Sequence, residues 1–277
     1  MRRETEEKTL FAALGIPMVI CLLAFFWIVY ILLMGIGTLN WNILTTSVLK
    51  GGMFEMIVGT IFLMAGAAGI SSPLGVLAAI YLVEYAPSGK MTRVIDQAIN
   101  NLAGVPSIVI GLFGYMFFCR QLGLGVSLAS GWLTLALMML PLVIRGSEES
   151  IRMVPTSFKE AALALGTTKW RAVSSTTLPA AAPGVVTSVI LGIARVAGET
   201  AAILFTACVL ITRGLPKSPL EPVMTLAYNI FVKIVALGAS PESVFGTALV
   251  LFLIVASLVL FATVLRAYYR RKQPWLS

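Results

Sequence analysis

Two charged residues, Arg195 and Glu199, lie four positions apart inside an otherwise apolar run of this sequence. In a helix this spacing places both side chains on one face. The guanidinium of an arginine stays protonated and can bind two oxygens of one anion with its planar fork. Charges are costly in the apolar core of a membrane and are seldom found there without a function. The pair therefore predicts an oxyanion site, at which Glu199 holds Arg195 when no anion is bound.

Small and polar residues share the predicted helical face of this pair. At about 100° per residue, the face holds Ser188, Gly192, Arg195, Glu199, Ala202 and Thr206. If the span starts at Gly184, Arg195 lies roughly 16 Å into an apolar core about 30 Å thick. We expect this face to line a translocation pathway, and we add Ser107 as a second serine that could bind an anion. Two alternatives stay open, because the ion pair could only fix helix packing and the serines could bond their own helix backbone.

Other kinds of site find little support in the composition. The chain has no histidine, which excludes histidine-based general base catalysis and histidine metal sites. Its three cysteines, Cys21, Cys119 and Cys208, lie far apart in apolar runs, so we interpret them as buried free thiols. The sequence has no GxxxxGK[ST] phosphate loop. We therefore expect neither ATP hydrolysis nor a bound cofactor in this chain.

The composition is that of a polytopic membrane protein. Of the 277 residues, 58% are hydrophobic and only 12% are charged, and the mean hydropathy is +0.95. A soluble globule of this length needs more polar surface. The apolar runs predict an all-α fold with six transmembrane helices, at about 10–38, 56–81, 99–119, 129–144, 184–211 and 244–265. A shorter apolar piece at 223–237 contains Lys233 and is interpreted as an interfacial or re-entrant helix.

The distribution of basic residues predicts the orientation in the membrane. Six spans put both termini on one side, and fourteen of the 20 Lys and Arg residues lie in segments on that side. Five lie in the opposite loops, and the remaining one is Arg195. By the positive-inside rule, both termini and the segment 145–179 are cytoplasmic. Topology in lipid thus accounts for the net charge of +8, and no nucleic-acid partner is needed.

The segment 145–179 is the longest polar interruption between apolar runs. Ser157 stands three residues before Glu160, which is the spacing of a capping box and predicts a helix from Phe158. Gly166 suits the left-handed residue that closes such a helix. A second helical pattern runs over about 168–177, and we expect Pro179 to end it. The sequence predicts a small helix–turn–helix that projects from the membrane, although an ordinary solvated loop has the same composition.

This segment carries a family resemblance. Glu160-Ala161-Ala162, Gly166 and Leu178-Pro179 resemble the EAA signature of ATP-driven importer permeases, with Thr176 where an aliphatic residue is usual. The resemblance implies the type I importer fold, also called MetI-like, whose cytoplasmic coupling helix docks into a groove on a separate ATPase. It assigns ATPase coupling to five residues: Ser157, Glu160, Ala161, Ala162 and Gly166. Residues 1–55 would form the N-terminal tail, first helix and outer loop, and residues 56–277 the permease core with its coupling loop at 145–180.

Three further segments sharpen the resemblance within about 59–207. The runs at 80–86 (IYLVEYA), 103–109 (AGVPSIV) and 195–201 (RVAGETA) resemble the phosphate-specific importer permeases of the PstA type more than the PstC type. The resemblance implies an inner-membrane importer for inorganic phosphate, with a PstC-like second permease, two PstB-like ATPases that carry ATP and Mg, and a periplasmic phosphate-binding protein. It also implicates Arg195 and Glu199 in transport.

Three alternatives to a phosphate permease remain from the residues themselves. The same architecture could carry another oxyanion such as sulfate, or another small solute. A membrane receptor or scaffold would need no aligned polar face with charges at mid-depth. A membrane enzyme is disfavoured by the lack of histidine and of a clustered pair of acids. Glu84, at a predicted membrane boundary, is interpreted as a solvated helix end.

Overall fold

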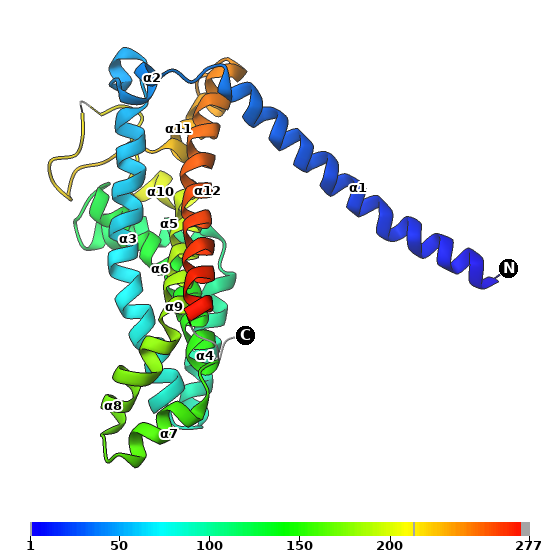
Figure 1. The fold of residues 1–277 in the computed structure, drawn as a ribbon. Coiled ribbons are helices and arrows are strands. Elements are labelled where there is room, and N and C mark those ends of the chain that lie inside the picture. The colour runs from blue at the N-terminus through cyan, green and yellow to red at the C-terminus, as the bar shows by residue number, and fades with distance from the viewer. Residues whose placement is uncertain (1, 213, 273–277) are drawn as a thin grey trace.

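The computed structural model describes residues 2–212 and 214–272 (Figure 1). Helices make up the described fold, apart from an isolated bridge between Cys208 and Val223. The helices, with 3-10 and π segments marked η, are α1 (Arg2–Ile36), α2 (Trp41–Thr45), η1 (Val48–Lys50), α3 (Phe54–Ile80), η2 (Tyr81–Tyr85), α4 (Lys90–Gly104), α5 (Ser107–Gly114), η3 (Tyr115–Gln121), α6 (Leu128–Arg152), α7 (Thr156–Ala164), α8 (Lys169–Ala172), η4 (Val173–Thr177), α9 (Leu178–Ala197), α10 (Ala201–Thr206), α11 (Leu226–Val235) and α12 (Pro241–Lys272). The predicted all-α fold is confirmed.

Five helical stretches in the described chain are long and apolar enough to cross a membrane. They are Gly15–Ile36, Phe54–Tyr85, Leu128–Arg152, Lys169–Ala197 and Pro241–Tyr269. A sixth is obtained when the bent pair Lys90–Gly104 and Ser107–Gln121 is counted as one span. The count of six predicted from the sequence agrees with this reading of the structure.

The predicted third span, 99–119, is wrong in its shape. Two helices that meet at an angle of 102° replace the single helix, and the break lies at Val105 and Pro106. Proline has no backbone N–H and disfavours helical geometry in the residue before it. Val105 is accordingly extended, with φ −69° and ψ 130°. The backbone at the break is irregular, which a membrane tolerates only where protein or water satisfies it.

The predicted boundaries of the fourth and fifth spans are also wrong. α6 continues past residue 144 to Arg152, so the first part of the predicted loop is helical. The fifth span begins at Lys169 rather than 184 and ends at Ala197 rather than 211. Pro179 does not end a helix but stands in the first turn of α9, where its missing N–H leaves no helix bond unmade. The π-helical η4 joins α8 directly to α9.

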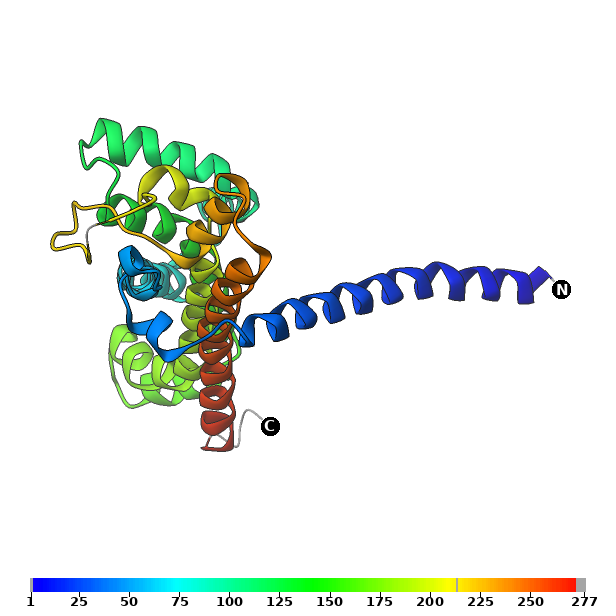
Figure 2. The ribbon, with the colours of Figure 1, turned by 90° about the horizontal axis from the view of Figure 1, so that it is seen from above.

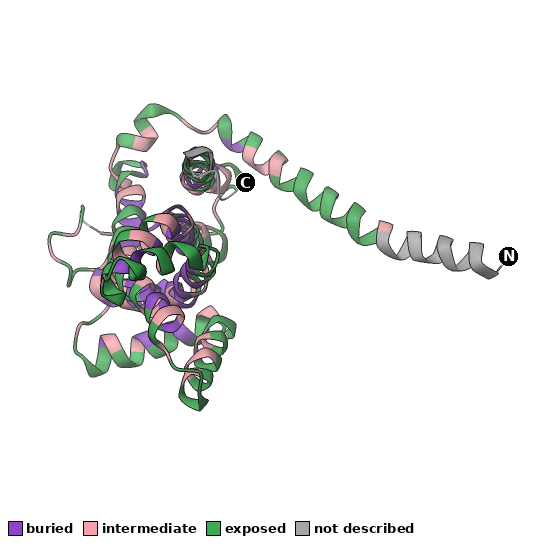
Figure 3. Cartoon of the chain, turned by 60° about the horizontal axis from the view of Figure 1, so that its bottom comes forward, coloured by how far each residue is buried: buried purple, intermediate pink, exposed green. Residues whose placement is uncertain are grey.

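Close approach of α3, α6 and α9 forms the core of the bundle. Small residues permit it: a Cβ added at Gly75 would lie 2.7 Å from Val143 Cγ1, and one at Gly192 would lie 2.7 Å from Met139 Cε. Glycine contacts of this kind replace the hydrophobic driving force that helices lack in lipid. The buried residues gather where these helices meet (Figure 3).

α1 stands apart from the rest of the molecule. It leaves the bundle near Gly35, where an added Cβ would lie 2.6 Å from Phe245 O of α12. Beyond that point it projects away from the bundle in both views (Figures 1 and 2). Cys21 on α1 is therefore exposed, whereas Cys119 and Cys208 are buried free thiols as predicted.

Candidate functional site

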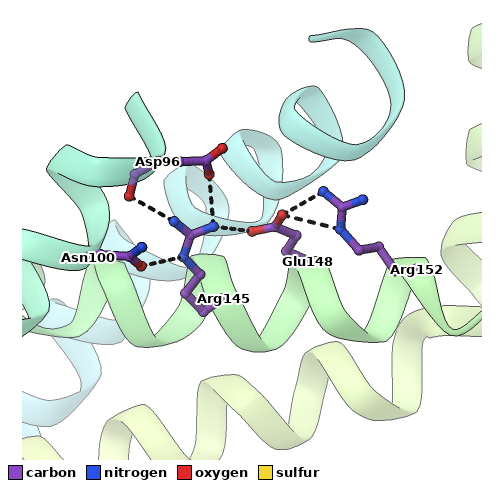
Figure 4. Close-up of polar contacts among 5 residues, drawn as sticks. All are labelled: Asp96, Asn100, Arg145, Glu148 and Arg152. Atoms are coloured by element: carbon purple, nitrogen blue, oxygen red, sulfur yellow. Dashed lines mark hydrogen bonds and ion pairs between the residues drawn. The ribbon is translucent and has the colours of Figure 1, made fainter. Parts of the chain in front are cut away.

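A cluster of charged residues joins α4 to α6 (Figure 4). Arg145 Nη1 lies 2.9 Å from Asp96 Oδ1 and 2.6 Å from Glu148 Oε2. Arg145 Nη2 donates to Asp96 O at 2.9 Å, and Nε donates to Asn100 Oδ1 at 3.1 Å. Arg152 Nη2 lies 2.8 Å from the other oxygen of Glu148. The Nε, Nη1 and Nη2 groups of Arg145 thus each have an acceptor, supplied by Glu148 on α6 and by Asp96 and Asn100 on α4.

Sequence reasoning missed this cluster because it placed 145–152 in a loop. On a helix, Arg145, Glu148 and Arg152 are three and four residues apart, which is the spacing of neighbouring side chains. Asp96 and Asn100 have the same relation on α4. The two spacings together were the available signal for a pair of facing polar helices.

A cavity of about 620 Å³ lies beside this cluster, between α6, α9 and the end of α12. Its lining residues are Leu142, Arg145, Gly146, Glu149, Ser150, Met153, Ala180, Ala181, Pro183, Gly184, Thr187, Ser188, Leu191 and Arg266. Two arginines, one glutamate and several hydroxyls thus face a space whose other lining side chains are apolar. Of the predicted pathway residues, Ser188 lines this cavity. Its hydroxyl donates to Gly184 O at 3.0 Å, so its oxygen remains able to accept a further bond.

Arg195 and Glu199 do not share one helix face, so that prediction is wrong. α9 ends at Ala197, and Gly198 forms its C-terminal cap. Glu199 lies in the break before α10, where its Oε1 accepts from Ala202 N at the long distance of 3.5 Å. Glycine has a poor helix propensity, and a carboxylate that caps the next helix favours a new start. The predicted ion pair does not form between the two side chains, which both lie in the described chain.

Arg195 itself is exposed near the end of α9. Its side chain makes no ion pair or hydrogen bond with any residue that the structure describes. α10, which follows the break, packs against α5 and α6. The guanidinium therefore belongs to a broken helix within the bundle and keeps its donors available for another group.

The other two predicted pathway residues take different positions. Thr206 is fully buried, and its hydroxyl donates to Ala202 O at 2.9 Å, so it satisfies the backbone of α10. Ser107 is half-buried at the start of α5, directly after the break at Pro106. α5 packs closely on α10, because a Cβ at Gly111 would lie 2.8 Å from Ala202 Cα. Two helix breaks, before α5 and before α10, are thus brought together.

The projecting helix–turn–helix is present as α7 and α8, at the end of the bundle opposite α2 (Figure 1). The helix α7 starts at Thr156 after Pro155, so the predicted cap by Ser157 is wrong. Proline pre-sets the extended approach to the helix, and no side chain caps it. Gly166 has φ +79°, and the predicted left-handed turn is confirmed. Ser157, Glu160, Ala161 and Gly166 are exposed, whereas Ala162 is buried.

Large apolar side chains are exposed on the same segment. Leu163 and Leu165 are 40% and 84% exposed, and Trp170 of α8 is 54% exposed.

Glu84, interpreted as a solvated helix end, is instead buried against this segment, with a side chain only 5% exposed. That interpretation is wrong because the carboxylate has a lysine partner, Lys159, at 2.8 Å.

Comparison with solved structures gives the class of protein that this fold defines. The chain superposes on one described as "Inward facing conformations of the MetNI methionine ABC transporter: CY5 native crystal form" with a TM-score of 0.63. The match covers 78% of this chain and 96% of the other at 19% identity, so it shows the fold. The fold is that of a MetI-type ABC importer permease. A family model described as "Binding-protein-dependent transport system inner membrane component" matches residues 71–273. The chain belongs to this family.

Curated relatives within the family include named permeases. The "Phosphate transport system permease protein PstA" of Yersinia pestis is 38% identical over 206 residues, which cover 70% of this chain and 68% of the relative. "PstA 1" of Mycobacterium tuberculosis (strain ATCC 25618 / H37Rv) is 44% identical over 154 residues, 56% of this chain and 50% of the relative. The "Probable ABC transporter permease protein YqgI" of Bacillus subtilis is 38% identical over 182 residues, 64% of this chain and 62% of the relative. The chain thus spans about half to two thirds of these relatives, and its resemblance to the PstA type is confirmed.

Proposed function

We propose that this chain is a permease subunit of an ATP-driven importer that moves inorganic phosphate across the cytoplasmic membrane. The observation that carries the proposal is the relationship to a protein named as a phosphate transport permease, at 38% identity over 206 residues. Those 206 residues are 70% of this chain. The family membership supports an importer, and the relatives' names support phosphate as its cargo.

Arg195 is the residue that we assign to the anion. Its guanidinium is exposed at the end of α9 and has no partner among the described residues. A fork of fixed positive charge suits an oxyanion, because two N–H groups can bind two oxygens. Glu199, two residues beyond the end of α9, would oppose the anion and favour its release. Ser188 and Ser107 would supply hydroxyls along the path, and Thr206 would hold the backbone of α10.

The motor is assigned to separate ATPase subunits, which would carry ATP and Mg. The projecting segment supports this assignment, since Leu163 and Leu165 expose apolar surface between the spans and Trp170 does so at the start of the fifth span. A short helix of this kind suits a groove on a partner. The exposed Ser157, Glu160, Ala161 and Gly166 would lie at that contact, and the buried Ala162 would seat α7 on its own chain. A PstC-like second permease and a phosphate-binding protein would complete the importer.

The function is tested by reconstituting the chain with its ATPase, second permease and binding protein in proteoliposomes. Radiolabelled phosphate and sulfate are supplied in separate assays, with ATP on the side of the ATPase. We expect ATP-dependent accumulation of phosphate and little of sulfate. Equal accumulation of both anions would favour a general oxyanion permease. A fully assembled complex that accumulates neither anion would refute the importer and favour a receptor or scaffold.

The orientation is a separate proposal, with both termini and α7 in the cytoplasm. It is supported by the fourteen-to-five distribution of basic residues. Single cysteines replace Thr5, Ser157 and Ser218 in a cysteine-free background, and an impermeant thiol reagent is applied from outside. We expect labelling at position 218 alone. Labelling at position 157 from outside would reverse the orientation.

A further inference from the structure

The ion pair between Lys159 and Glu84 ties the projecting segment to the end of α3. Lys159 Nζ of α7 lies 2.8 Å from Glu84 Oε2 of η2. The carboxylate side chain is only 5% exposed and the lysine side chain 30% exposed. Removing one partner of a buried pair leaves an uncompensated charge, which is strongly unfavourable. The contact joins residues 75 positions apart in the chain.

A second lysine reaches the same point from the other side of the Gly166 turn. Lys169 Nζ of α8 donates a hydrogen bond to the carbonyl oxygen of Glu84. The same ammonium lies 4.7 Å from the centroid of the Tyr85 ring, within the range of a cation–π contact. Both helices of the projecting segment are therefore anchored on two consecutive residues at the end of α3.

Local backbone geometry presents Glu84 to these lysines. Residues Tyr81–Tyr85 form a π-helical turn, in which Ala86 N donates to Tyr81 O at 2.8 Å. A π turn widens the helix and rotates the following side chains relative to an α-helix, and such turns are frequent at functional sites. A second π turn, η4, lies between α8 and α9. The segment thus contacts one π turn through Lys159 and Lys169 and continues directly into the other at η4.

Apolar packing beneath α7 is sparse, so the polar contacts have to hold its orientation. Ala162 is the one buried residue within α7, whose residues are all described. A cavity of about 300 Å³ lies between the start of α7 and the ends of α3 and α6. Glu84, Lys159 and Thr177 line it, and the Thr177 hydroxyl is buried with no hydrogen-bond partner among the described atoms. Val83, Ile151 and Val154 also line this cavity, so the start of α7 is separated there from the ends of α3 and α6 by unfilled space of mixed polarity.

We propose that Glu84 and Lys159 form a clamp that transmits motion of the coupling segment to α3. The proposal rests on the proposed function, in which an ATPase moves α7. Glu84 and Lys159 are positioning residues, because neither contacts the anion site. Without the pair, motion at α7 would reach the bundle through the chain connections to α6 and α9 and through the Lys169 contacts of α8. The clamp adds a direct path from α7 to the end of α3, which packs on both α6 and α9.

The test uses the whole importer complex, with phosphate uptake and ATP hydrolysis measured per assembled complex. Lys159→Met should reduce uptake about tenfold or more while ATP hydrolysis continues, since losing a buried partner is far from neutral. The exchange Glu84→Lys with Lys159→Glu should restore much of the uptake. The exposed Lys90→Met is the matched control and should leave both activities unchanged. Normal uptake by Lys159→Met, or an exchanged pair no better than the single variants, would overturn the clamp.

A second measurement does not depend on the cargo. Spin labels replace Tyr81 of η2 and Ala164 of α7, both exposed, in a cysteine-free complex. The wild-type pair should show a narrow distance distribution, which Lys159→Met broadens and the exchanged pair narrows again. An unchanged distribution in Lys159→Met would refute the clamp. A narrow wild-type distribution in a complex that takes up no phosphate would instead refute the proposed function alone.

Discussion

Arg145 and Arg195 are both arginines of bundle helices, but their surroundings are opposite. Arg145 has ion pairs with Asp96 and Glu148 and further hydrogen bonds to α4. Arg195 is exposed and has no ion pair among the described residues. Because a bound anion must compete with existing partners, the occupied guanidinium is suited to joining helices. The unoccupied one is suited to a ligand.

The backbone explains the difference between the two sites. α6 continues for two turns beyond Arg145, so Glu148 and Arg152 follow at helical spacing and α4 faces them. α9 ends two residues after Arg195, so no helical neighbour can pair with it from the following turn. The continuous helix α6 thus supplies an acceptor for Arg145, whereas the end of α9 leaves the donors of Arg195 without one from the next turn.

The comparison predicts its largest effect for Arg195→Gln. Uptake of phosphate should fall about a hundredfold, because two charged hydrogen bonds to the anion are lost. Assembly and melting temperature should stay at wild-type values, since no described residue would lose an ion pair or hydrogen bond with Arg195. The measurements are radiolabelled phosphate uptake per assembled complex and the melting temperature of the purified chain.

Two further variants serve as controls for this prediction. Arg93→Gln removes an exposed positive charge from α4 and should leave uptake unchanged. Arg195→Gln combined with Glu199→Gln should remain inactive, because the structure holds the two residues apart. Full uptake by the double variant would show that the two charges only stabilise each other. Arg195 would then be a structural arginine, as Arg145 is.

Arg145→Gln should have the opposite signature. It removes the ion-pair partner of Asp96 and one of the two arginine partners of Glu148, which keeps Arg152. We expect a loss of about 1–3 kcal/mol in stability, discounted because the arginine side chain is 32% exposed. The melting temperature and the yield of assembled complex should fall, and uptake should fall in proportion to assembly. Arg145→Lys keeps the charge without the fork and should recover part of the stability. Unchanged stability together with abolished uptake would move Arg145 to the anion pathway.

The sequence predicted the class of fold well and the geometry of the site poorly. Apolar length was enough for the number of spans but not for the bounds of the third, fourth and fifth, and Gly166 was enough for the left-handed turn. The helix breaks at Pro106 and Gly198 were not foreseen, because apolar runs continue through both. The Arg145 cluster was missed for the opposite reason, since a run of polar residues is typical of a loop and here lies on a helix. Hydropathy measures transfer into lipid and does not report where a backbone bends inside protein.

Glu148→Gln should give a smaller effect than Arg145→Gln. Glu148 bridges Arg145 and Arg152, but Arg145 would keep its bonds to Asp96 and Asn100. We expect a loss of about 0.5–1.5 kcal/mol, because the amide oxygen can still accept one bond. The adjacent Glu149→Gln is the matched control, since Glu149 is exposed and has no ion pair among the described residues. Equal losses in the two variants, measured as melting temperature, would contradict a cluster centred on Arg145 and Glu148.

Lys233 on α11 gives the smallest expected effect and extends the comparison to a cation with neutral partners. Its Nζ donates to Ser243 O at 3.0 Å and to Thr247 Oγ1 at 2.9 Å. Burial lowers the pKa of Lys233 below its ordinary value. The unfolded chain therefore binds the proton more tightly than the folded one. The folded state gains stability as pH rises from the folded pKa toward the unfolded value of about 10.4.

Lys233→Met removes this titration and keeps the length of the side chain. Thr247 keeps its bond to Ser243 O at 3.0 Å, so no hydroxyl is stranded. We expect the melting temperature near pH 7 to change by no more than about 2 °C. We also expect the wild-type chain to gain more stability between pH 7 and pH 10 than the variant does. Parallel melting temperatures of wild type and variant across that range would contradict a lowered lysine pKa. A large loss of stability at pH 7 would show that Lys233, like Arg145, is a cation that holds helices together.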